Sequence, residues 1–156
     1  MATKTANVPA ALQHIRELLD QGRPDEALNV VTRSGDESPE MQNARGVCLL
    51  RLGKLDEAVK VLQDITCQGL AAGMSRHAPA LFQVNFAIAM LRANREKGGA
   101  LLIADWLNGN EHPEAARLKA AVRQWKKSIG LLGRVRCRLG AYPATPVPVD
   151  ERAGAV

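Results

Sequence analysis

An internal repeat limits what this chain can fold into more than any other feature of its sequence. Residues 18–31 read LLDQGRPDEALNVV and residues 49–62 read LLRLGKLDEAVKVL, so seven of fourteen residues are kept at an offset of 31. In and around both copies the apolar residues recur at steps of three and four, the spacing of one face of an α-helix. A unit of this size holds two helices and buries its apolar face only against a neighbouring unit. We therefore predict a stack of helical hairpins.

The composition agrees with a single all-α domain. Apolar residues make up 46% of the 156 residues, which is enough for a sizeable core, and only 3% are aromatic. Because the apolar residues are mostly Ala, Leu and Val, close packing of helices is favoured over a β-sandwich.

Three hairpins can be placed along the chain. The first runs from about Pro9 to Arg33 and turns at Gly22, and the second spans about Glu40 to Thr66 and turns at Gly53. Glycine suits the left-handed conformation that ends a helix. A weaker third copy follows 41 residues after the second, with Asn94 at its turn.

A final helix is expected to begin at Pro113 and to cap the stack. Its apolar residues form one stripe that can cover the exposed end of a hairpin array, namely Ala115, Leu118, Val122, Trp125 and Ile129. The glycines at 130, 133 and 140 are expected to weaken and end helicity. We divide the chain into a flexible N-terminus at 1–8, a repeat domain with its capping helix at 9–140, and a flexible, proline-containing tail at 141–156.

The repeats resemble the tetratricopeptide repeat (TPR) family, whose unit is a pair of antiparallel helices of about 34 residues. The matching positions in the three copies are Ile15, Leu18, Gly22, Ala27 and Val31; Gly46, Leu49, Gly53, Ala58 and Leu62; and Ala87, Met90, Asn94, Gly99 and Ile103. The aromatic positions of the family hold Leu, Met, Val or Ile here. The resemblance covers about residues 9–108 and implies an α-α superhelix that acts as a non-catalytic adaptor or scaffold.

The resemblance also implies a concave groove, lined by the first helix of each hairpin, that holds a peptide or a helix of a partner protein. The family's groove positions fall on Leu12, Arg16, Asp20, Asn43, Val47, Arg51, Val84, Asn85, Ile88 and Arg92. From these we predict the partner-binding residues to be Arg16, Asn43, Arg51, Asn85, Ile88 and Arg92. The arginines favour an acidic partner, because a guanidinium binds carboxylates through paired hydrogen bonds, although most arginines on helices are only solvated. The groove that clamps the terminal carboxylates of heat-shock chaperones needs Lys and Asn where this chain has Leu12, Ala44 and Leu81, so we do not expect that activity.

Charge supports an alternative hypothesis. The net charge is +5, and residues 113–140 hold eight basic side chains against one acidic side chain. Such a segment can bind nucleic acid or an acidic surface, here through Arg134, Arg136 and Arg138, but aromatic residues that would stack on bases are scarce. A solvated polar face is the simplest explanation. A small secretion-type TPR chaperone is a further alternative, although those proteins tend to be acidic.

The sequence shows no pattern for catalysis. It has no Gly-rich phosphate loop, no G-x-S-x-G turn and no H-E-x-x-H helix, and its three His and three Cys are scattered without a C-x-x-C pair. We therefore expect no enzyme, no metal and no cofactor, and we interpret Cys48 as a core residue. Because no signal peptide or apolar run of 18 residues occurs, we expect a cytoplasmic protein that does not bind membranes.

Overall fold

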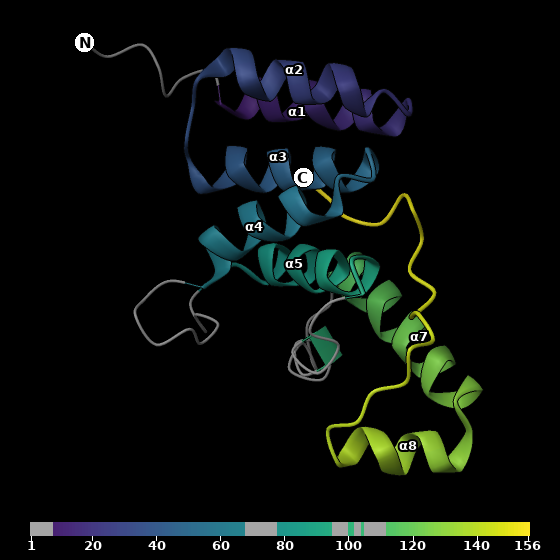
Figure 1. Ribbon diagram of the computed structural model, residues 1–156. Coiled ribbons are helices and arrows are strands. Elements are labelled where there is room, and N and C mark those ends of the chain that lie inside the picture. The colour runs from purple at the N-terminus through teal and green to yellow at the C-terminus, as the bar shows by residue number, and fades with distance from the viewer. Residues whose placement is uncertain (1–7, 68–77, 95–99, 102–103, 105–111) are drawn as a thin grey trace.

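The computed structural model describes residues 8–67, 78–94, 100–101, 104 and 112–156, and its regular elements there are all helices. These are α1 (Val8–Asp20), α2 (Pro24–Ser34), α3 (Pro39–Arg51), α4 (Leu55–Thr66), α5 (Ala80–Arg92), α7 (Pro113–Ser128) and α8 (Gly130–Arg138). From α1 to α5 each helix packs on the next, and α7 packs on α5. The first helices of the hairpins also touch in series, α1 with α3 and α3 with α5 (Figure 1). The predicted all-α stack is confirmed.

The turns inside the hairpins adopt the left-handed conformation. The φ angle is 72° at Gly22, 73° at Gly53 and 55° at Asn94. Glycine adopts positive φ without steric cost, and Asn is one of the few other residues that tolerate it. In the third copy, Gly99 and Ile103 lie outside the described residues.

Small residues let the two helices of a hairpin approach closely. Ala27, Ala58 and Ala87 are completely buried. A Cβ atom added to Gly46 on α3 would lie 2.5 Å from Cγ of Leu62 on α4, so the missing side chain of Gly46 makes room for a buried leucine. This contact holds α3 and α4 in one register.

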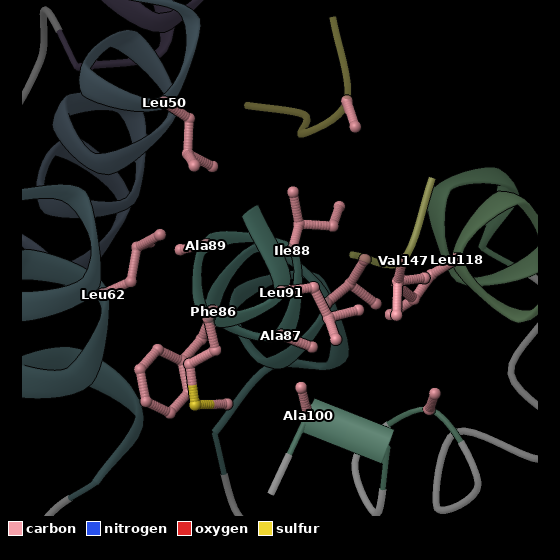
Figure 2. Close-up of a cluster of buried hydrophobic side chains, with 14 of the residues drawn as sticks. Leu50, Leu62, Phe86, Ala87, Ile88, Ala89, Leu91, Ala100, Leu118 and Val147 are labelled. Atoms are coloured by element: carbon pink, nitrogen blue, oxygen red, sulfur yellow. The ribbon is translucent and has the colours of Figure 1, made fainter. Parts of the chain in front are cut away.

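The capping helix forms where its apolar stripe predicts. Ala115, Leu118, Val122 and Trp125 on α7 are buried, and Ile129 is partly buried against the same core cluster. That cluster also contains Ile88 and Leu91 of α5, so α7 closes the end of the stack (Figure 2).

The chain beyond α7 differs from the expectation in two ways. Gly130, with φ of 65°, ends α7, but a further helix, α8, follows at once instead of a loss of helicity. Residues 141–156, which we call the tail, were expected to be flexible. Instead the tail runs back past α7 and ends against α3 and α5, with Val147 and Ala153 buried (Figure 1). Its composition did not reveal this, because the partners that hold it lie on distant helices.

Candidate peptide-binding groove

The side chains predicted to bind a partner converge on the chain's own tail. Five of the six predicted residues donate hydrogen bonds to it, and they come from the first helix of each hairpin. We call these five residues, together with Glu114 of α7, the groove: Arg16 on α1, Asn43 and Arg51 on α3, Asn85 and Arg92 on α5, and Glu114. The tail therefore occupies the surface where the TPR resemblance places a ligand.

Two buried asparagines form the centre of the groove. Asn85 is 0% exposed, and its amide Nδ2 donates to the Ala155 carbonyl at 2.8 Å while its Oδ1 accepts the Ala155 N–H at 3.1 Å. The same Nδ2 also donates to Oδ1 of Asn43 at 2.8 Å, and Asn43 Nδ2 donates to the Ala155 carbonyl at 3.3 Å. One side-chain amide thus pairs with both polar groups of a single peptide residue, as a neighbouring β-strand would.

The arginines extend this recognition along the tail. Arg51 Nη2 donates to the Gly154 carbonyl at 3.0 Å, and Arg16 Nε donates to the Val156 carbonyl. Arg92 Nη1 donates to the Glu151 carbonyl at 3.1 Å and to the Leu50 carbonyl at the end of α3 at 2.8 Å. The Leu50 carbonyl also accepts the Gly53 N–H at 3.1 Å, and its bond with Arg92 ties α5 to the last turn of α3.

Arg51 is only partly satisfied by the tail. Its Nε is buried, and within the described residues no acceptor lies in hydrogen-bond reach of it. Burial lowers the pKa of the Arg51 guanidinium, and the carboxylates of Glu114 and Asp20 act in the opposite direction. The guanidinium stays charged at neutral pH, because the ordinary pKa of arginine is far above 7.

Two residues of α7 contact the tail that the sequence analysis did not assign to a site. The Glu114 side chain is buried, and its Oε2 accepts the Gly154 N–H at 3.2 Å while its Oε1 pairs with Arg117 at 2.6 Å. The indole Nε1 of Trp125 donates to the Thr145 carbonyl at 3.0 Å. A buried indole N–H usually finds an acceptor, and here the tail supplies it.

Gly154 lies close to Asn85, Val47 and Leu50 in the groove. Its φ of 101° is one that residues with a Cβ rarely adopt. An added Cβ would lie 3.5 Å from Asn85 Oδ1, 3.5 Å from Val47 Cγ1 and 3.6 Å from Leu50 Cδ1. A methyl group would therefore make ordinary contacts on three sides, and the φ angle is what disfavours a side chain at this position.

Ile88, the sixth predicted residue, contributes apolar surface. It is buried in the main core cluster together with Val147 of the tail and Leu118 of α7 (Figure 2). It also lines a cavity of about 260 Å³ between α7 and the tail at residues 148–153.

The alternative basic patch has a different geometry. Arg134, Arg136 and Arg138 lie on α8. Because a helix turns 100° per residue, Arg136 projects about 160° away from both Arg134 and Arg138. Arg134 Nε donates to the Lys126 carbonyl at 2.8 Å. Apolar side chains with high exposure stand beside these arginines, including Leu131, Leu132 and Leu139. The helix therefore does not present the three arginines as one row.

The described part of the chain holds no group of three His, Cys, Asp or Glu side chains that could bind a metal ion. Within the same ranges, every helix is too short or too polar to span a bilayer. Burial raises the pKa of the Cys48 thiol to about 12, so this side chain is a core residue and not a nucleophile.

Comparison with known proteins supports the family resemblance. A family model described as tetratricopeptide repeat matches residues 18–69, which span α2, α3 and α4. Residues 18–69 of this chain are therefore similar to tetratricopeptide repeats. Repeats of this family generally serve as protein–protein interaction modules and are generally not catalytic. No curated protein and no solved structure gave a match.

Proposed function

We propose that the groove binds an extended peptide segment of a partner protein, so that the chain works as a non-catalytic adaptor. The observation that carries this proposal is the pairing of Asn85 with both the N–H and the carbonyl of Ala155. All six groove residues bond to main-chain atoms of the tail and not to its side chains. A surface built in this way recognises an extended main chain from any source.

An extended segment suits the groove better than a partner helix does. A helix satisfies its N–H and carbonyl groups internally, so it cannot offer them to Asn85 or Asn43. Apart from the bond between Asn85 and Asn43, these amides would then lose their partners, which costs about 1 to 3 kcal/mol for each group left unsatisfied. The arginines add a preference for acidic side chains near the bound segment. A secretion-type chaperone would be a special case, in which the partner is an exported protein.

The proposal can be tested with a phage-displayed library of random ten-residue peptides that is selected on the full chain. Affinities of the selected peptides are then measured by fluorescence anisotropy. Asn85→Ala removes the paired hydrogen bonds and should weaken binding about tenfold or more when both chains also carry Gly154→Val, so that no docked tail competes with the peptide. Asn29→Ala is the matched control, because Asn29 is an exposed asparagine on α2 that makes none of the tail contacts described above.

Two results would contradict the proposal. In the Gly154→Val background, peptides that bind equally tightly with and without Asn85→Ala do not use the groove. If their binding is lost instead in Arg136→Glu or Arg138→Glu chains, the basic helix α8 is the binding surface.

A further inference from the structure

Building on the proposed function, we propose that residues 150–156 are an internal ligand, which the groove exchanges for a partner peptide in which a small residue precedes a glycine. In the docked tail these two residues are Ala153 and Gly154. The tail then competes with the partner, and binding requires that the tail leaves the groove.

The tail is held at two separate places. The first is beside α7, where Val147 is buried and Trp125 donates to the Thr145 carbonyl. The second is the groove itself, at residues 151–156. Between them the tail spans the cavity of about 260 Å³ next to Leu118. This cavity is partly open to solvent, so the bridging segment is not enclosed on all sides as a core layer is.

This arrangement allows the groove end of the tail to leave while the first anchor stays. Asp150, Glu151 and Arg152 are exposed, so their side chains are hydrated in both states. The bonds that break are hydrogen bonds to main-chain atoms, and a second peptide can replace each of them. An exchange of this kind conserves the contacts that Asn43 and Asn85 need.

The geometry at Gly154 defines the kind of peptide that can replace the tail. Its φ of 101° favours glycine, because residues with a Cβ rarely adopt this angle. The buried state of Ala153 next to it favours a small residue there as well. A competing partner peptide should therefore carry glycine with a small residue before it.

A partner must also overcome the advantage of a tethered competitor. A ligand on a short linker has an effective concentration in the millimolar range. The buried Nε of Arg51 provides a further contact, since the tail bonds only to Nη2. A carboxylate on the partner that reaches both nitrogens would form a paired, charge-assisted bond that the tail does not make.

The test measures binding of a fluorescein-labelled peptide with the sequence of residues 149–156, VDERAGAV, to the full chain by anisotropy. Gly154→Val in the chain should release the tail and raise the affinity for this peptide roughly 10- to 100-fold, the factor for a tail docked in about 90 to 99% of molecules. Gly154→Ala, which adds one methyl group, should give an intermediate affinity. Glu151→Gln is the matched control and should leave the affinity unchanged, because the groove uses only the carbonyl of Glu151. A peptide in which valine replaces glycine should not bind.

Several results would contradict the inference that residues 150–156 are an internal ligand. One is a Gly154→Val chain with parental circular dichroism that binds the peptide no more tightly than the parent. Loss of helix content in both glycine variants would show that the tail is part of the fold and not an exchangeable ligand. A parent chain that forms dimers, which the peptide separates in sedimentation velocity, would assign the docked segment to a second copy.

The same measurements separate this inference from the proposed function. If library peptides depend on Asn85 but bind the parent and Gly154→Val chains equally, the proposed function stands. The inference that the tail is an internal ligand is then wrong. If no selected peptide depends on Asn85, both the proposed function and the internal-ligand inference are wrong.

Discussion

The contact between Gly46 and Leu62 makes a sharp prediction about how the hairpins are packed. In the interior of a helix, alanine is normally more stable than glycine by about 0.5 to 1 kcal/mol. Here the new Cβ would lie 2.5 Å from Cγ, 2.6 Å from Cδ2 and 3.1 Å from Cδ1 of Leu62, which is fully buried and cannot move into solvent. Overpacking of this kind costs about 1 to 3 kcal/mol. We therefore expect Gly46→Ala to lower the free energy of unfolding by about 1 to 2 kcal/mol.

The assay is urea unfolding followed by circular dichroism at 222 nm, with Leu62→Ala as the second arm of a double-mutant cycle. Leu62→Ala alone should cost about 2 to 5 kcal/mol, because it leaves a cavity. In that background the clash is gone, so Gly46→Ala should stabilise the chain by about 0.5 to 1 kcal/mol. The sign of the effect should thus reverse. If Gly46→Ala stabilises the parent chain, α3 and α4 do not meet at these residues and the packing described above is wrong.

Three further predictions concern the cap, the core thiol and the binding surface. Trp125→Phe removes the indole bond to the tail and should lower the free energy of unfolding by about 1 to 2 kcal/mol in the same urea assay, whereas an unchanged midpoint would place the ring outside the core. The Cys48 thiol, with its pKa raised from 9.0 to about 12, stays neutral in the folded chain while the unfolded chain ionises. Stability should therefore fall as pH rises from 9 toward 12, and a Cys48→Ala chain that falls equally would contradict this assignment. Arg51→Glu should lower the affinity of groove-binding peptides about tenfold or more, whereas replacing both Arg136 and Arg138 by Glu should change it less than about twofold. The opposite pattern in anisotropy titrations would favour α8 as the binding surface.

The helices and turns could be predicted because short-range rules fix them. The offset of 31 residues located the first two hairpins, and Gly22, Gly53 and Asn94 adopt the positive φ expected at the end of a helix. The stripe on the capping helix followed from its spacing of three and four residues. Each of these features depends on residues that are close in the sequence, so one chain was sufficient to find them.

The occupant of the groove could not be predicted in the same way. Arg16, Asn43, Arg51, Asn85 and Arg92 were found by projecting the family's groove positions onto the repeats, yet what they bind lies 59 to 140 residues away in the sequence. Composition predicted a flexible tail, since it holds three prolines. Its order comes from hydrogen bonds that the groove supplies, and no local pattern encodes those.

The central claim, that the tail is a ligand docked in the groove, is tested most directly by amide hydrogen exchange of the unmodified chain, measured by NMR. The Gly154 N–H donates to Glu114 and the Ala155 N–H donates to Asn85. Both amides should exchange about 10- to 100-fold more slowly than in an unfolded chain, because a tail docked in about 90 to 99% of molecules slows exchange by this factor. Addition of a groove-binding peptide should remove this protection while amides within α3 keep theirs. Exchange of Gly154 and Ala155 at unfolded-chain rates in the free protein would contradict the account.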